Sequence, residues 1–217
     1  MVSIPQRLLN KARDVLDHAQ ARLFGTAHHE RVWRKRGVEG SYWDSRDHPH
    51  RKMLMDMIAE FEPLSVLEIG CNSGPNIYLL AKRFPEARIE GFDINGEAIE
   101  EGRRLLESSG VENANIYTSS FDRLRELQDG AFDVVLTDAV LIYAGKDRIR
   151  ELTKDIARVA RKGVVMVEFH ESGVGPDGHM VPKTGYWARD YEALLKEVDE
   201  GLALRTIKID RETWNDD

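Results

Sequence analysis

The sequence of 217 residues lacks three features that would place it outside the cell or in a membrane. Cys71 is its single cysteine, so no disulfide can form within the chain, which fits a reducing compartment. No stretch approaches the roughly 20 apolar residues that a membrane span needs. The N-terminus also lacks the apolar core of a secretory signal. The sequence therefore predicts a cytoplasmic protein without a membrane span.

Positive charge is outnumbered by negative charge. The chain has 31 lysines and arginines against 38 acidic residues, a net charge of −7. Such a chain would be repelled by a phosphate backbone, so we expect a small-molecule substrate and no nucleic acid. The densest cationic stretch spans residues 31–36 and is flanked by Glu30 and Glu39. The histidines and acids form no recognisable metal-ligand spacing, so no metal is expected.

Apolar residues make up 41% of the chain, enough for a globular core. Residues 3–24 have the apolar spacing of an amphipathic helix. We expect this helix to pack on the main domain or on a second subunit, so a homodimer is compatible with the sequence. The alternative is peripheral contact with an anionic membrane surface, which the interleaved Asp14 and Asp17 weaken. A second helix is predicted over residues 49–61, with Pro49 at its first position.

From residue 64 onward, the pattern alternates between short apolar strands and amphipathic helices. This alternation predicts an α/β fold: a Rossmann-like three-layer sandwich whose mostly parallel sheet has helices on both faces. We divide the chain into an N-terminal helical extension or lid, 1–60, and a main domain, 61–217. The predicted strands are 65–70, 88–94, 113–119, 132–138, 163–169 and 202–210, and the predicted helices are 75–84, 95–108, 147–161 and 187–198.

The most informative segment is VLEIGCNSG, residues 66–74, in which a buried strand ends in an acid and a glycine-rich turn opens a helix. Gly70 permits a tight turn and close approach of a ligand to the backbone. Asn72 stands where a second glycine is common, and asparagine tolerates left-handed backbone better than most residues. A second acid, Asp93, ends the next strand, where a carboxylate can accept hydrogen bonds from both ribose hydroxyls.

These motifs resemble those of the class I S-adenosylmethionine-dependent methyltransferases, and FDVVLTDAVLIY, residues 132–143, resembles the fourth-strand motif of that family. The resemblance implies S-adenosylmethionine as the cofactor. The family often has an acid at the position of Ser120 to receive the adenine amine, a contact that Asp122 could supply here. A looser similarity points to methyltransferases of sugar and surface-glycan biosynthesis. The cofactor-binding residues that the resemblance implies are Glu68, Gly70, Cys71, Asn72, Gly74, Asp93, Ile94, Ser120, Phe121, Asp138 and Ala139.

Ligands of open α/β sheets bind outside the carboxyl ends of the strands, where His170 and Glu171 follow the fifth predicted strand. Histidine is a suitable general base near neutral pH, so we assign catalysis to His170, helped by Glu171, with His48 in reserve. The predicted reaction is O-methylation of a small hydroxylated metabolite or a sugar or glycan precursor. A protein or RNA methyltransferase is the alternative. A nicotinamide-dependent oxidoreductase is disfavoured because the turn is not G-x-G-x-x-G, and a non-catalytic cofactor-binding module stays open.

Two further segments are expected to border the site. Tyr42, Trp43, Arg46 and Arg51 precede the main domain, and in the resembling family an N-terminal segment folds over the cofactor. An aromatic lid would exclude water and an arginine could pair with the methionine carboxylate; helix packing with solvated charge is the alternative. The polar, glycine-rich loop 171–186 is expected to lie over the site and to contribute to substrate choice.

Overall fold

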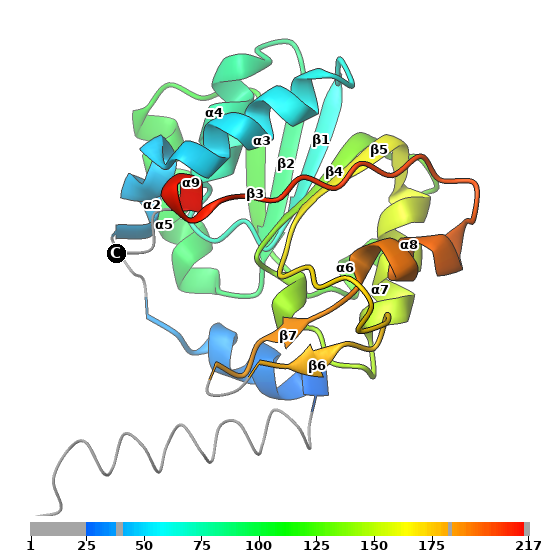
Figure 1. Cartoon of the computed structure of the whole chain (residues 1–217). Coiled ribbons are helices and arrows are strands. Elements are labelled where there is room, and N and C mark those ends of the chain that lie inside the picture. Colours follow the sequence, from blue (N-terminus) through cyan, green and yellow to red (C-terminus); the bar gives the residue numbers. More distant parts are fainter. Residues whose placement is uncertain (1–24, 38–40, 182–183, 215–217) are drawn as a thin grey trace, which may run out of the picture.

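A computed structural model of the protein describes residues 25–37, 41–181 and 184–214; the helix predicted over 3–24 lies outside them. Five parallel strands form a central sheet in the order β3-β2-β1-β4-β5 (Figure 1). The strand order reverses between β1 and β4, the point at which sheets of this kind bind ligands. The strands are β1 (Ser65–Ile69), β2 (Arg88–Asp93), β3 (Ala114–Thr118), β4 (Phe132–Asp138) and β5 (Ala160–Val167).

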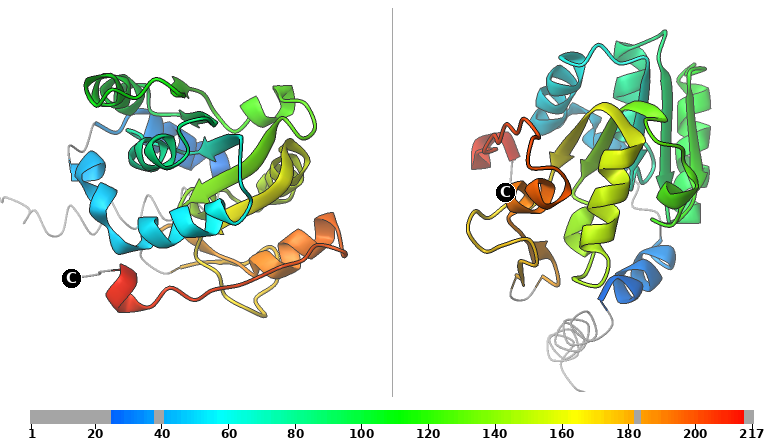
Figure 2. Two further views of the ribbon diagram at one scale, coloured as in Figure 1. Left: turned by 90° about the horizontal axis from the view of Figure 1, so that it is seen from above. Right: turned by 90° about the vertical axis from the view of Figure 1, so that its right-hand side faces the viewer.

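Helices cover both faces of the sheet, which gives the three layers that the sequence predicts (Figure 2). Successive residues of a strand point to opposite faces. Val66 therefore joins the core under α3, α4 and α5, and Leu67 joins the core under α6, α7 and α8. These helices are α3 (Pro49–Ala59), α4 (Pro75–Arg83), α5 (Gly96–Ser108), α6 (Arg123–Glu126), α7 (Ile149–Val159) and α8 (Tyr191–Val198).

Local signals in the sequence explain where these helices begin. Pro49 and Pro75 occupy the first turn of α3 and α4, where a missing N–H costs nothing. The side chain of Asn95 caps α5 by accepting hydrogen bonds from the backbone N–H groups of Glu97 and Ala98. Both devices are read directly from the sequence, and the Rossmann-like fold class is confirmed.

Two predicted elements differ. The strand predicted over 202–210 is wrong: this segment is extended but pairs with no strand of the described chain. It instead runs past α3, where Arg205 donates a hydrogen bond to Glu60 at 2.8 Å. Ile209 packs on the core under α3, α4 and α5, here called the first core. The segment then leads to the short helix α9 (Arg211–Trp214). The helix predicted from residue 187 begins at Tyr191, because β7 (Trp187–Ala188) pairs with β6 (His179–Met180) in a small hairpin within the predicted loop.

Residues 25–34 form a helix, here called the cover helix, that lies beyond the carboxyl ends of the strands near β6 and β7 (Figure 1). It is attached at both ends. The Thr26 hydroxyl donates to Asp147 Oδ1 at 3.2 Å and accepts from the Gly145 N–H at 2.9 Å, while Asn95 Nδ2 donates to the Arg36 carbonyl at 2.9 Å. The short helices α2 (Ser41–Asp44) and η1 (Ser45–Asp47) then lead into α3. None of the helices in the described ranges is long and apolar enough to cross a membrane.

Candidate active site

The turn after β1 has the left-handed backbone that its sequence predicts. The φ angles of Gly70, Asn72 and Gly74 are 75°, 49° and 81°. The N–H groups of Gly70 and Cys71 both donate to the Phe92 carbonyl of β2, at 2.8 and 3.1 Å, and fix the turn to the neighbouring strand. A Cβ on Gly70 would lie 2.4 Å from Val140 Cγ2, so glycine is required here by space as well as by conformation.

Asp93 connects this turn to the end of β2. Its Oδ2 accepts a hydrogen bond from the Asn72 N–H at 2.9 Å, and its Oδ1 accepts one from the Asn95 N–H at 2.8 Å. Burial raises the pKa of the Asp93 carboxyl, although these backbone hydrogen bonds oppose the rise. The carboxylate is thus fixed in direction at a position that a ligand can reach.

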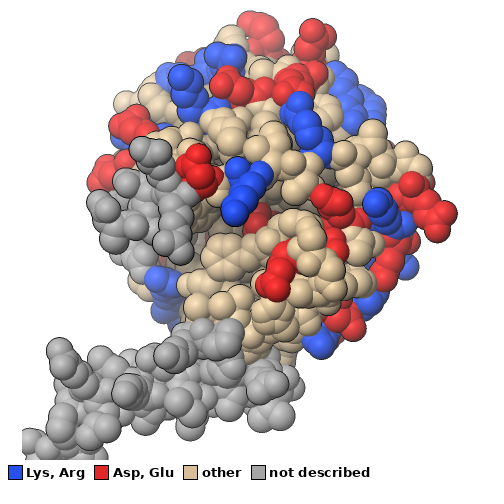
Figure 3. Space-filling model, viewed as in Figure 1, with Lys and Arg blue, Asp and Glu red and all other residues tan. Residues whose placement is uncertain are grey.

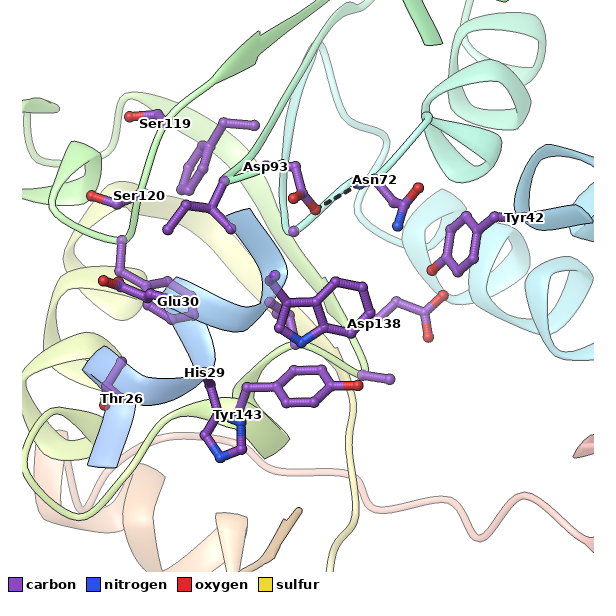
Figure 4. Close-up of a pocket in the computed structure, with 17 residues that line it drawn as sticks. Thr26, His29, Glu30, Tyr42, Asn72, Asp93, Ser119, Ser120, Asp138 and Tyr143 are labelled. Atoms are coloured by element: carbon purple, nitrogen blue, oxygen red, sulfur yellow. Dashed lines mark hydrogen bonds between the residues drawn. The ribbon is translucent and has the colours of Figure 1, made fainter. Parts of the chain in front are cut away.

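The turn, the ends of β2 and β4 and the cover helix enclose one pocket (Figure 4). Eight of the eleven residues predicted to bind the cofactor line it: Gly70, Asn72, Asp93, Ile94, Ser120, Phe121, Asp138 and Ala139. The other lining residues, which the sequence did not assign to cofactor binding, are Thr26, His29, Glu30, Trp33, Tyr42, Phe92, Ser119, Val140 and Tyr143.

Three predicted cofactor residues lie behind the pocket wall. Cys71 is buried in the first core, and burial raises the pKa of its thiol, which makes it a poor nucleophile. Gly74 is the N-cap of α4 and packs near Ile77. Glu68 is buried within β1, where its Oε1 accepts a hydrogen bond from Asn76 Nδ2 at 2.7 Å. None of the three is among the residues that line the pocket.

A buried polar cluster lies behind the Asp138 wall of the pocket. Asp138 Oδ2 accepts hydrogen bonds from Arg51 Nη1 at 3.2 Å and Asn76 Nδ2 at 3.0 Å, and it lies 3.1 Å from His50 Nε2. Burial favours the neutral form of Asp138, but the hydrogen bond and charge of His50 and the charge of Arg51 lower its pKa. Burial raises the pKa of Glu68 to about 8, and Glu68 Oε2 has no hydrogen-bond partner. The cluster therefore holds Asp138 ionised and favours a protonated Glu68 near neutral pH.

Arg51 does not fill the role expected of an N-terminal arginine. It does not line the pocket, and its guanidinium is occupied by Ser45, Asn76 and Asp138. Trp43 and Arg46 also lie elsewhere: Trp43 is part of the first core, and Arg46 stacks over it. Of the four residues expected in an aromatic lid, Tyr42 lines the pocket.

His48 and His50 form a chain that leads away from Asp138. Their Nδ1 atoms are 2.5 Å apart, and His48 Nε2 lies 2.8 Å from the Trp214 carbonyl. A carbonyl only accepts, so His48 carries its proton on Nε2 and accepts at Nδ1 from His50. His50 Nδ1 is then a donor, and the contacts connect Asp138 through His50 to His48.

The other two predicted catalytic residues are not brought to the pocket. His170 Nε2 contacts Ser172 Oγ at 3.0 Å, and its Nδ1 accepts from the Tyr191 N–H at 3.2 Å. Glu171 is about half exposed and faces His179 at 3.6 Å. Neither lines the pocket, because the chain turns away after β5 toward the β6–β7 hairpin. The acid that ends this strand next to the pocket loop is Glu168.

Glu168 supports the loop after β4. Its carboxylate accepts hydrogen bonds from the N–H groups of Val140, Leu141 and Ile142 at 3.1–3.3 Å, and burial raises its pKa to about 7. The loop begins at Ala139, whose φ of 54° is unusual for a residue with a Cβ. No local pattern predicts this left-handed backbone, because Ala139 is held by a hydrogen bond from its N–H to the Val167 carbonyl of the neighbouring strand, at 2.8 Å.

Aromatic side chains close the pocket opposite the sheet. Tyr143 lies with its ring centroid 5.1 Å from that of Trp33, 5.5 Å from that of His29 and 5.3 Å from that of Tyr186. Trp33 and His29 come from the cover helix, and Tyr186 comes from the loop that was expected to border the site. Among the described residues that line the pocket there is no lysine or arginine, whereas Glu30, Asp93 and Asp138 are acidic.

No group of three or more histidine, cysteine or acidic side chains in the described part of the chain could hold a metal ion. The lining of the pocket instead combines the Asp93 carboxylate with the apolar side chains of Ile94 and Phe121.

Comparison with known proteins agrees with this geometry. Residues 66–163 match the family model described as a methyltransferase domain. Two curated relatives are 33% identical: a ribosomal RNA small subunit methyltransferase C from Hahella chejuensis, over 52% of this chain and 32% of the relative, and a trans-aconitate 2-methyltransferase from Rhodopseudomonas palustris, over 59% and 47%. The chain thus spans less than half of the length of these relatives.

Solved structures of such enzymes share the fold. A SAM-dependent methyltransferase from Aquifex aeolicus superimposes with a TM-score of 0.53 at 16% identity, over 75% of this chain and 88% of that one. Residues 66–163 match a methyltransferase domain, and the chain shares the fold of a solved S-adenosylmethionine-dependent methyltransferase. The expected sugar and glycan subfamily finds no support in these comparisons.

Proposed function

We propose that this chain binds S-adenosylmethionine in the pocket and transfers the methyl group to a hydroxyl of a small molecule. The observation that carries the proposal is the Asp93 carboxylate, held toward the pocket by two backbone N–H groups beside the left-handed turn at Gly70 and Asn72. A carboxylate fixed in this way can accept hydrogen bonds from a pair of adjacent hydroxyls, such as those of a ribose.

The lining residues suggest how the cofactor would be held. Asp93 would take the ribose hydroxyls, and Ile94 and Phe121 would contact the flat base. The backbone at Gly70 and Ala139 would border the methionine portion, close to Asp138. Glu68, Cys71 and Gly74 would contribute by maintaining the turn rather than by contact.

When bound, S-adenosylmethionine supplies a methyl group activated by a sulfonium. The work left to the protein is to hold the acceptor atom close to that methyl and in line with the departing sulfur. The aromatic side chains of Trp33 and Tyr143 would exclude water from this region and orient the acceptor.

A hydroxyl acceptor must also lose its proton. Among the predicted catalytic residues, His48 is connected to the pocket through His50 and Asp138, whereas His170 and Glu171 are not in contact with it. We therefore assign proton transfer to the chain of Asp138, His50 and His48. Its outer end at His48 is half buried, so it could exchange protons with solvent.

The charge of the site favours a neutral small acceptor. Glu30, Asp93 and Asp138 line the pocket without a lysine or arginine among the described lining residues, which disfavours a polyanion. Acidic and basic side chains are also intermixed on the face shown in Figure 3, where no extended basic surface is visible. RNA is the second candidate, because one relative is named for ribosomal RNA. A homodimer and a cytoplasmic location remain part of the proposal.

Methyl-labelled S-adenosylmethionine tests the acceptor class. The purified chain is incubated with separate small-metabolite, RNA and protein fractions, and label is counted in each product. The proposal predicts label in the small-metabolite fraction that disappears in the Asp93→Ala variant. Label in RNA alone would transfer the assignment to RNA, and no label in any fraction would favour a non-catalytic binding module.

A further inference from the structure

Glu30 is a pocket residue whose role the fold does not explain. It belongs to the cover helix and lines the pocket. Its Oε1 atom is buried and has no hydrogen-bond partner. Burial also raises the pKa of this carboxyl, although the charge of Arg148 opposes the rise. A buried acceptor without a donor is costly, so it marks a place where a ligand N–H or O–H would stabilise the protein.

The surroundings of Glu30 limit what that donor can be. Glu30 and Ser120 lie at one end of the pocket, Asp138 and Tyr42 lie at the other, and Asp93 lies between them (Figure 4). The wall near Ser120 continues into Ile94 and Phe121, which are apolar. A flat ring between apolar groups that carries an N–H donor on its edge would meet all of these features.

Asp122, which the sequence offered for this contact, is not available for it. Its side chain is 57% exposed and does not line the pocket. Its Oδ1 is engaged by Arg125 at 3.2 Å and by Arg148 at 2.8 Å. The acid that faces the ring end of the pocket therefore comes from the opposite side, from Glu30.

We propose that Glu30 accepts a hydrogen bond from the exocyclic amine of the adenine ring, and that the cover helix thereby reads the base of the cofactor. This inference rests on the proposed function, since it assigns a residue to the same nucleoside site. It also gives the cover helix a role beyond excluding water. The helix is attached to the domain through Thr26 and Arg36. A hydrogen bond between Glu30 and the bound adenine would add a third attachment between these two and would hold the helix over the pocket.

The test compares two ligands that differ at the exocyclic group alone. S-Adenosylhomocysteine carries an amine at C6, whereas its 6-deamino analogue, with purine in place of adenine, carries a hydrogen there and offers the Glu30 carboxylate no donor. Calorimetric titration of the wild-type chain should show about tenfold or greater preference for the adenosine ligand. The Glu30→Gln variant keeps the shape of the side chain and can either accept or donate, so its preference should fall to about threefold or less.

Asp122→Asn is the matched control, because it removes an acid of the adjacent loop. Its preference should equal that of the wild-type chain, and thermal melting should confirm that both variants are folded. An unchanged preference in Glu30→Gln, or a reduced one in Asp122→Asn, would overturn the assignment of Glu30 and leave the proposed function standing. Failure of the wild-type chain to bind either nucleoside would overturn both.

Discussion

The floor and the cover of the pocket are built in different ways. The floor is the turn after β1 and the end of β2, where backbone groups of Gly70, Cys71 and Asn72 are bonded to Phe92 and Asp93 between two buried cores. The cover helix is attached by a few side-chain hydrogen bonds and by the contacts of Trp33 and His29 with Tyr143. The difference suggests that the floor fixes where a ligand binds, while the cover adjusts how tightly and how selectively it is held.

The largest effect should follow from removing the carboxylate of the floor. Asp93→Ala loses two charge-assisted contacts to ligand hydroxyls and releases the N–H groups of Asn72 and Asn95, so the dissociation constant for S-adenosylhomocysteine should rise about 100-fold or more. Calorimetric titration measures it. Glu90→Gln on the same strand, which pairs with Arg88 away from the pocket, is the control and should bind normally. An unchanged affinity in Asp93→Ala would show that the floor does not carry binding.

A second variant tests whether the floor turn is also a stability element. Gly70→Ala combines a left-handed backbone with a Cβ 2.4 Å from Val140, so the free energy of unfolding should fall by roughly 2–4 kcal/mol. Gly110→Ala is a matched control, because Gly110 has a φ of 64° but no neighbour within 4 Å of the added Cβ. Its loss should be about 1 kcal/mol. Equal losses of unfolding free energy in the two variants, measured by urea denaturation, would show that the close contact with Val140 does not add to the cost of Gly70→Ala.

The buried acid beneath the floor gives a pH-dependent prediction. The folded state raises the pKa of Glu68 from 4.5 to about 8, so the protein gives up stability as pH rises through that interval. Glu68→Gln mimics the protonated form, so the stability of this variant should not fall in this way as the pH rises. The free energy of unfolding of the variant relative to the wild type should therefore increase between pH 5 and pH 8, on the order of 2–4 kcal/mol. Parallel curves would mean that Glu68 ionises without cost.

The smallest effect is expected at the cover. Thr26→Ala removes the hydroxyl that joins Asp147 to Gly145, so the free energy of unfolding should change by about 1 kcal/mol or less. Amides of residues 27–36 should exchange hydrogen faster, and ligand affinity should fall about threefold. Ser108→Ala, an exposed hydroxyl at the end of α5, should change neither. A loss of affinity as large as that of Asp93→Ala would erase the distinction between floor and cover.

The floor was predictable because its signals are local. The strand periodicity of β1 to β5, the cap at Asn95 and the left-handed Asn72 each follow from a few neighbouring residues. The same holds for Asp93, whose position at a strand end determines where its side chain lies.

The cover and the polar cluster depend on contacts between distant segments, so short-range patterns did not reveal them. Glu30 lines the pocket and His50 contacts Asp138, and both come from elements that are far in sequence from the strand ends. Similarly, residues 202–210 alternate like a strand but cross α3 instead of pairing with β5, which no local pattern indicates. His170 does not line the pocket, because the chain turns away from the sheet edge after β5.

Calorimetric titration of the wild-type chain with S-adenosylmethionine and, separately, with NAD tests the central claim most directly. The account predicts saturable binding of S-adenosylmethionine at one site per chain and no binding of NAD. Binding of NAD alone would contradict it and indicate an oxidoreductase, and binding of neither would show that the pocket formed by Asp93 and its turn is not a nucleoside site.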